Sequence, residues 1–188
     1  MSSPPRILIG ISGGPGTGTT TLSKLLSARL GLPHVYAGQI FRSLAAERGM
    51  TLAEFGKYAE AHPEVDRELD ARLVKRAAEG QVILEGRMVV WQIEQARVPA
   101  LRVLLVAPEL VRATRVATRE GKADVADVLA ENRAREASEA KRYHEIYGFE
   151  PNDPSKYDLV IDTADKTPEQ IADLVITAAR KVFPGLVA

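Results

Sequence analysis

A glycine-rich turn between an apolar run and a helix-like segment is the feature that most limits what this chain can fold into. Residues 7–22 read I-L-I-G-I-S-G-G-P-G-T-G-T-T-T-L. Gly13 and Gly18 hold the glycine positions of the G-x-x-x-x-G-K-[ST] pattern, and Thr20 holds its hydroxyl position. Backbone N–H groups can converge on a phosphate where side chains do not intervene, and the next helix adds its unpaired N–H groups. The stretch therefore predicts a strand, a phosphate-binding loop (P-loop) and a helix.

One position departs from this pattern. Thr19 stands where a lysine usually reaches the β- and γ-phosphates of a nucleotide. Lys24 lies five residues further along the expected helix, more than one turn away and rotated off the same face. The missing positive charge must come from elsewhere, and the sequence leaves open whether Lys24 or a distant arginine replaces it. The alternative is an ordinary glycine-rich turn that binds no phosphate.

The composition suits one α/β domain. The chain has 188 residues, of which 45% are hydrophobic, enough to form a core. Lys+Arg and Asp+Glu are balanced at 25 each, so the total charge gives no support for binding nucleic acid or a membrane surface. The absence of cysteine excludes disulfides and thiolate metal sites. Neither a signal peptide nor a run of transmembrane length is found, so we expect a soluble, cytoplasmic protein.

Strand-like and helix-like segments alternate along the chain. Strands are expected at 6–12, 34–36, 81–84, 101–106 and 158–162. Helices are expected at 18–30, 39–48, 51–61, 63–78, 108–120, 125–147 and 167–182. This alternation predicts a parallel sheet covered by helices on both faces. Ligands of such sheets bind at the carboxyl ends of the strands, so the turns after Ser12, Tyr36 and Leu84 should face one crevice.

Arginines follow two of these strands. Arg42 lies in the helix after the second strand, and Arg87 comes directly after the third. Either guanidinium could bind a phosphate in a fork geometry. The alternative for each is a surface ion pair. Beside a P-loop, phosphate binding is the interpretation that we favour.

Further arginines recur on two expected helices at spacings that place them on shared faces. They are Arg112, Arg115 and Arg119 on one helix, and Arg135 and Arg142 on the next. Arg133 points away from the second face. Positive groups near a P-loop suit phosphoryl transfer, which spreads negative charge over the transferring oxygens. The alternative is a solvated surface on which the arginines pair with carboxylates of the same helices: Glu120, Glu131, Glu136 and Glu139.

The acidic and histidine residues give weaker signals. Glu85 ends the third strand and either holds Mg²⁺ through water or pairs with Arg87. Asp66 and Asp70 share a helix face, and a solvated helix is the default interpretation. The three histidines are dispersed and have no metal-ligand spacing. Tyrosines such as Tyr36 and Tyr58 are expected to pack, with these two bordering the crevice.

Seven segments together carry a resemblance to a known family. They are G-G-P-G-T-G-T-T-T (13–21), A-G-Q-I-F-R (37–42), E-F-G-K-Y-A-E (54–60), L-E-G-R (84–87), R-E-G (119–121), R-E-A-S-E-A-K-R-Y (135–143) and Y-D-L-V-I-D-T (157–163). With them the chain resembles the cytidylate kinases, in particular their short archaeal-type branch. The segments follow the family's order and cover nearly the whole chain.

The resemblance implies the fold of a P-loop nucleoside-monophosphate kinase. A five-stranded parallel sheet flanked by helices would carry a helical monophosphate-binding insertion at about 37–79 and a lid at about 112–147, all within one domain spanning 1–188. The implied activity is MgATP-dependent phosphorylation of CMP and dCMP by direct in-line transfer.

The resemblance also implies the site residues. ATP would be bound by Gly13, Gly14, Pro15, Gly16, Thr17, Gly18, Thr19, Thr20 and Thr21. Arg42 and Arg87 look like ligands of the CMP phosphate. Arg119, Arg135 and Arg142 look like the lid arginines around the transferring phosphoryl group. Independently of the resemblance, the loop pattern predicts that Thr20 holds the Mg²⁺ of the nucleotide, and the position of Glu85 at a strand end predicts that it does so indirectly. Gln39 stands where the family often has an acidic residue, so the resemblance does not assign it a contact with the sugar or the base.

Other functions remain as alternatives. One is a P-loop kinase for another small acceptor, such as UMP, AMP or a non-nucleotide. Another is a nucleotide-binding module with little transferase activity, which Thr19 would favour. We expect a monomer whose partners are ATP and CMP or dCMP, with no nucleic acid and no membrane. The preference between CMP and dCMP and the tolerance for UMP cannot be predicted from the sequence.

Overall fold

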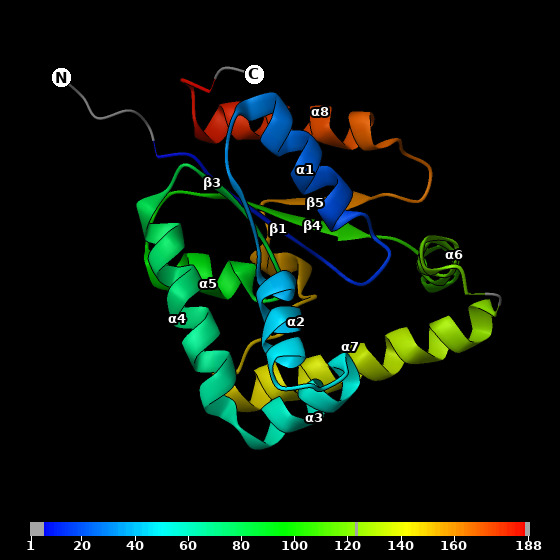
Figure 1. The fold of residues 1–188 in the computed structure, drawn as a ribbon. Helices are drawn as coiled ribbons and strands as arrows, with labels where there is room; N and C mark the ends of the chain where they lie inside the picture. The colour runs from blue at the N-terminus through cyan, green and yellow to red at the C-terminus, as the bar shows by residue number, and fades with distance from the viewer. Residues whose placement is uncertain (1–5, 123, 187–188) are drawn as a thin grey trace.

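The fold is built on a five-stranded parallel sheet (Figure 1). We describe residues 6–122 and 124–186 of a computed structural model, so both ends of the predicted domain and Ala123 of the predicted lid lie outside the described residues. The strands are β1 (Leu8–Gly13), β2 (His34–Tyr36), β3 (Val82–Glu85), β4 (Leu101–Val106) and β5 (Leu159–Asp162). Their order in the sheet is β2-β3-β1-β4-β5, and all four pairings are parallel. The predicted fold class is confirmed.

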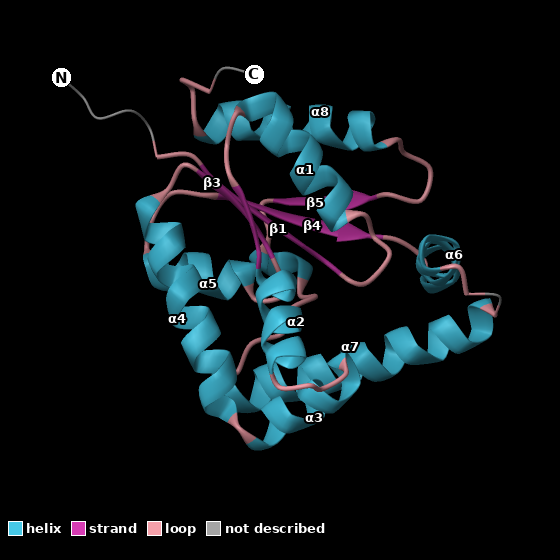
Figure 2. Ribbon diagram, viewed as in Figure 1, coloured by secondary structure: helices cyan, strands magenta, loops and turns pink. Residues whose placement is uncertain are grey.

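Eight α-helices connect and cover these strands in the described ranges (Figure 2). They are α1 (Thr19–Leu30), α2 (Ala37–Glu47), α3 (Leu52–Ala61), α4 (Pro63–Glu79), α5 (Val89–Ala96), α6 (Glu109–Glu120), α7 (Val125–Tyr147) and α8 (Pro168–Val182). A short 3₁₀ helix, Pro154–Lys156, precedes β5. The predicted boundaries hold to within a few residues. Helix α5 was not predicted, because its eight residues show too little periodicity to separate a helix from a buried strand.

Helices cover both faces of the sheet. On one face α1 and α8 pack on β1 and β4 through buried side chains such as Leu26, Ile11 and Val175. On the other face α4 and α5 pack on β1 and β3 through side chains such as Leu73, Val89 and Leu8. Because both faces of the central strands are buried, side chains on both faces of these strands are apolar.

Two helical regions extend from this core toward the same side of the molecule. Helices α2, α3 and α4 follow β2, and the long helix α7 packs against α3 (Figure 1). Local capping explains several of their ends: Thr51 and Glu54 form a capping box at α3, and Asp124 caps α7. None of the helices in the described ranges is long and apolar enough to cross a membrane.

Candidate active site

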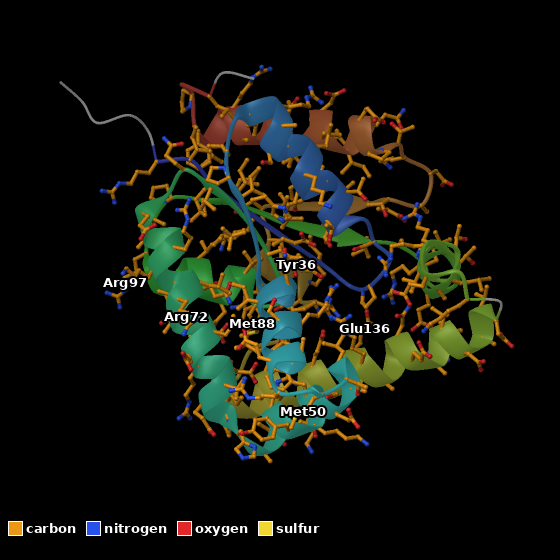
Figure 3. All side chains as sticks on the ribbon, viewed as in Figure 1. Tyr36, Met50, Arg72, Met88, Arg97 and Glu136 are labelled. Atoms are coloured by element: carbon orange, nitrogen blue, oxygen red, sulfur yellow. The ribbon has the colours of Figure 1, made fainter. Side chains whose placement is uncertain are left out.

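A large cavity lies where the P-loop, α2–α4 and α7 meet. Its volume is about 970 Å³. All nine residues of the loop at 13–21 line it, and so do the ends of β2 and β3 and the inner face of α7. Figure 3 places Tyr36, Met88 and Glu136 on the inner side, between the sheet and α7, and Arg72 and Arg97 on the outer side. The predicted crevice at the carboxyl ends of the strands is thus present.

The loop itself has the shape that phosphate binding requires. The amide and the hydroxyl of Thr17 both donate to the carbonyl of Gly14, which closes a tight turn. Gly16 and Gly18 have φ angles of 83° and 95°, in the left-handed region that favours glycine. Gly18 is the N-cap of α1, so the helix begins at Thr19 with its free N–H groups beside the loop.

Helix α6 packs directly onto this loop. A Cβ atom on Gly16 would overlap the backbone of Arg112, and one on Gly14 would overlap the side chains of Arg112 and Glu136. Arg112 is buried and donates to Glu136 at 2.6 Å, while Arg115 donates to the hydroxyl and carbonyl of Thr163. The alternative of a solvated surface is therefore wrong for these two arginines, because both join α6 to the loop and to the end of β5.

Glu85 is the centre of a buried polar network. Its Oε1 atom accepts hydrogen bonds from Thr19 at 2.8 Å and from Thr20 at 2.6 Å. Its Oε2 atom lies 2.8 Å from Nε2 of His34. The alternative pairing of Glu85 with Arg87 is wrong. His34 was not predicted here, although the pairing of β2 beside β3 is what brings the two residues together.

Arg87 and Arg135 share one carboxylate. Nε of Arg87 donates to Glu139 at 3.0 Å, and Nε of Arg135 donates to the other oxygen at 2.8 Å. Burial alone would raise the pKa of Glu139, but the two guanidinium groups outweigh burial and hold it below its ordinary value. Ion pairs thus join the turn after β3 to α7.

Arg142 lies deeper in the cavity and faces two aspartates. Its Nε atom is 2.7 Å from Oδ2 of Asp66, and both residues are buried. Asp70 is also buried and accepts a hydrogen bond from Gln92 at 2.7 Å. The prediction that Asp66 and Asp70 lie on a solvated face is wrong. Their spacing of four residues indicated only that they share a face of α4. The sequence does not reveal that this face is buried.

The remaining predicted residues differ in their exposure. Arg42 lines the cavity and donates to the hydroxyl of Tyr36 at 2.5 Å. Arg119 also lines it, but its side chain is 65% exposed and pairs with Glu120. Lys24 is exposed on α1 and is not among the described residues that line the cavity. Tyr36 borders the cavity as expected, whereas Tyr58 stacks on His62.

Two lysines of the site were missed by the sequence analysis. Lys57 of α3 and Lys166, in the turn before α8, both line the cavity. Lysines at exposed helix and turn positions are common on any protein surface, so the sequence did not indicate that these two line the cavity. Each adds positive charge to a cavity whose loop lacks the usual lysine.

The oxygen donors near the loop fit a magnesium ion that arrives with a nucleotide. The hydroxyl of Thr20 and the carboxylate of Glu85 are hard oxygen ligands, and they lie next to each other. Within residues 6–122 and 124–186, no group of three or more His, Asp or Glu side chains is arranged to hold a metal ion. Mg²⁺ is typically held by one or two protein oxygens together with phosphates, so this sparse donor set is compatible with it.

Comparison with solved structures defines the class of fold. The structure is similar to a gluconokinase from Sinorhizobium meliloti, with a TM-score of 0.60, 15% identity and coverage of 98% of this chain and 97% of that one. It is also similar to a shikimate kinase from Acinetobacter baumannii, with a TM-score of 0.59, 16% identity and 93% coverage of both chains. Fold and loop together define the fold class of the P-loop kinases.

Comparison of sequences gives the family. The profile of the cytidylate kinase-like family matches residues 8–165. The cytidylate kinase of Pyrococcus horikoshii is 46% identical over 179 residues, which cover 95% of this chain and 91% of that protein. The cytidylate kinase of Methanocaldococcus jannaschii is 47% identical and is covered to 97%. The chain belongs to the cytidylate kinase-like family, which confirms the resemblance identified from the sequence.

Proposed function

We propose that this protein transfers the γ-phosphoryl group of MgATP to CMP and dCMP. The observation that carries the proposal is one cavity in which a P-loop faces arginines from α2, from the turn after β3 and from α7, in a chain of the cytidylate kinase-like family. The loop side suits a triphosphate, and the arginine side suits a monophosphate acceptor.

In this proposal residues 13–21 bind the phosphates of ATP. The backbone N–H groups of the loop and the start of α1 act as donors. Thr20 would hold Mg²⁺ and Glu85 would hold it indirectly; when bound, the ion neutralises the charge on the phosphate oxygens. Thr19 and His34 keep the carboxylate of Glu85 fixed through hydrogen bonds to its two oxygens. Cations on the cavity wall replace the charge of the missing lysine.

The acceptor occupies the side of the cavity formed by α2–α4 and α7. Arg42 and Arg87 bind the phosphate of CMP, since both line the cavity close to the end of the sheet. Arg119, Arg135 and Arg142 surround the transferring group as residues of the lid. Residues 37–79 then form the monophosphate-binding insertion and residues 112–147 the lid, within one domain.

Chemistry in this site is direct attack by a phosphate oxygen of CMP on the γ-phosphorus of ATP. Both nucleotides carry the reacting oxygens, so the protein has no nucleophile to supply and no covalent intermediate is needed. The protein holds the two phosphates in line, neutralises their charge and excludes water by closing the lid. Water exclusion matters because an open site would let water accept the phosphoryl group.

Release of ADP from MgATP by the purified protein tests the proposal. The acceptors compared are CMP, dCMP, UMP, AMP, GMP and none. Turnover that strongly favours CMP or dCMP is the expected result. Turnover with a different acceptor would keep the mechanism and reject the cytidylate assignment. ATP binding without acceptor-dependent turnover would instead support a nucleotide-binding module.

The proposal also includes two features of the protein as a whole. We propose a cytoplasmic monomer that binds neither nucleic acid nor membranes. Its balanced charge is the support for the last two points. Sedimentation at micromolar concentration, with and without nucleotides, tests the oligomeric state.

A further inference from the structure

Hydrogen-bond donors occupy the carbonyl groups of the P-loop. The carbonyl of Gly14 accepts from Thr17 within the loop, and the carbonyl of Thr17 accepts from the buried hydroxyl of Thr163 at 3.1 Å. The carbonyl of Pro15 accepts from Nη1 of Arg112 at 3.4 Å. None of the described peptide bonds is cis, and the carbonyl and N–H groups of a trans peptide point in opposite directions. A donor that fixes one of these carbonyls therefore also fixes the direction of the N–H group of the next residue.

Two N–H groups of the loop are free to bind an anion. The N–H group of Gly16 lies in the same peptide as the carbonyl of Pro15, and that of Gly18 follows the carbonyl of Thr17. Neither group donates to another described residue. Free N–H groups that turn the same way around a loop form an anion site. The direction of the Gly16 group depends on Arg112, which binds the carbonyl of the same peptide.

Arg112 is itself held in place by Glu136 of α7. Nη1 of Arg112 donates to Oε1 of Glu136 at 2.6 Å, and Nη2 donates to Oε2 at 3.4 Å. Nε of Arg112 donates to the carbonyl of Ala107 at 3.2 Å, and the residue is buried. All three nitrogens of the guanidinium thus have partners. The group cannot turn away from the loop without losing several charge-assisted hydrogen bonds.

Arg112 and Glu136 also contact the loop at Gly14. A Cβ atom on Gly14 would lie 2.2 Å from Oε1 of Glu136 and 2.5 Å from Nη1 of Arg112, so only glycine leaves room for the pair. Neither Arg112 nor Glu136 is among the described residues that line the cavity. The pair therefore supports the loop from its outer surface and does not reach a nucleotide in the cavity.

We propose that Arg112, oriented by Glu136, is a positioning residue that keeps the N–H group of Gly16 directed at a phosphate of the donor nucleotide. The inference rests on the proposed function, because it takes the loop to bind a nucleoside triphosphate. It adds a pair of residues that act on the donor through the backbone of the loop. The affinity for ATP depends on this pair, whereas the affinity for the acceptor does not.

A second role for Arg112 predicts the opposite result in one variant. Arg112 could supply the positive charge that Thr19 lacks. In that case Glu136→Gln would release the charge of Arg112 from its partner and strengthen the binding of ATP. If Arg112 positions the loop, the same variant loosens the guanidinium and weakens the binding of ATP. The sign of the change in affinity therefore separates the two roles.

Calorimetry with the non-hydrolysable β,γ-imido analogue of MgATP, in the absence of any acceptor, is the first experiment. We expect Arg112→Gln to raise the Kd by about tenfold or more, and Glu136→Gln to raise it by about twofold or more. The double variant should bind no more weakly than Arg112→Gln alone, because Glu136 acts through Arg112. In steady-state kinetics the KM for ATP should rise in the same order, while the KM for CMP stays within about twofold of the wild type.

The chain offers a matched control for the loss of an ion pair between α6 and α7. Arg133 of α7 pairs with Glu109 of α6, and the hydrogen bonds of the Arg133 side chain reach only Glu109. Arg133→Ala therefore removes a link between the same two helices without disturbing the loop. We expect it to leave the Kd of the analogue within about twofold of the wild-type value.

Thermal unfolding shows whether each variant is folded at the temperature of the assay. The inference is overturned if folded Arg112→Gln binds the analogue as tightly as the wild type, or if Glu136→Gln binds it as tightly or more tightly. It is also overturned if the losses of the two single variants add in full, or if the KM for CMP rises as much as the KM for ATP. Should Arg112→Gln not fold, Glu136→Gln decides alone. Failure of the wild type to bind the analogue would instead overturn the proposed function.

Discussion

The two sides of the cavity hold their charged groups in different ways. On the P-loop side, one carboxylate, Glu85, is fixed by two hydroxyls of the loop and by His34. On the α7 side, Arg142 and Arg135 pair with carboxylates that are themselves buried, Asp66 and Glu139. Glu85 and His34 lie on strands β3 and β2 of the sheet, whereas Arg135, Glu139 and Arg142 all lie on the long helix α7. Under the proposed roles, the contacts of Glu85 persist during turnover, whereas those of the α7 arginines are exchanged when a phosphate arrives; we call the two sides the fixed side and the exchangeable side.

The largest expected effect concerns the fixed side. Thr19 and Thr20 both donate to Glu85, but only Thr20 holds the position that would ligate Mg²⁺. We expect Thr20→Ala to lower kcat by roughly 100- to 1,000-fold, and Thr19→Ala by less than about tenfold. Steady-state kinetics over a range of Mg²⁺ concentrations measure both. Equal losses in the two variants would show that the hydroxyls act only through Glu85.

The next effect is on stability and concerns Asp66. Burial raises its pKa to about 6, against the opposing charge of Arg142; Asp70 and Glu139 also face it and add to the increase. The folded protein therefore keeps a proton on Asp66 that the unfolded chain releases near pH 4. The free energy of unfolding should fall, by up to about 3 kcal/mol, as pH rises from about 4 to 6.

Urea unfolding between pH 4 and 7 measures this dependence. The matched variant is Asp66→Asn, which cannot titrate and should lack this part of the fall. Other groups titrate in the same range, so the difference between the two curves is the quantity of interest. Parallel curves for the wild type and the variant would contradict the prediction.

A smaller effect is expected from the exchangeable side. Arg142→Ala should lower kcat by at least about tenfold while the fold survives, because the proposed role of Arg142 is to neutralise charge in the transition state. Lys141→Ala removes a neighbouring exposed charge from the same helix and serves as the control. An unchanged kcat in Arg142→Ala would remove this residue from the transition-state role and leave it a part of the floor of the cavity.

The smallest effect should come from an ion pair on the outer side of α7. Arg133 donates to Glu109 of α6, and the Arg133 side chain is 60% exposed. We expect Arg133→Ala to change the free energy of unfolding by less than about 1 kcal/mol and kcat by less than about twofold. Thermal unfolding and the ADP-release assay check both values. A loss of activity as large as that of Arg142→Ala would mean that the two faces of α7 do not differ as described.

Much of the fold could be predicted because its signals are local. Apolar runs, glycine caps and capping boxes lie within a few residues of each other, and the strands at 34–36 and 101–106 are observed as predicted. The loop at 13–21 was found for the same reason, since its pattern is contiguous. Helix α5 escaped because eight residues are too few to show a helical period.

The partners of the charged residues could not be predicted in the same way. Glu85 meets His34 because β2 and β3 are neighbours, and Asp66 of α4 meets Arg142 of α7 only in the folded chain; the two residues of each pair are far apart in the sequence. Position in the chain identified most of the arginines that line the cavity. It did not reveal that Asp66 and Asp70 are buried, because that depends on which face another helix covers.

The bridge from Glu139 to Arg87 and Arg135 has a consequence for the end of the catalytic cycle. Under the proposed roles, this carboxylate occupies the two guanidinium groups whenever no phosphate is present. The Glu139 carboxylate thus competes with the phosphates of the nucleotide product for Arg87 and Arg135, and it does so at a high local concentration because it belongs to the same chain. Such competition lowers the affinity for the product and shortens its residence time. Glu139, which does not contact the reacting atoms, would therefore help to set the rate of turnover.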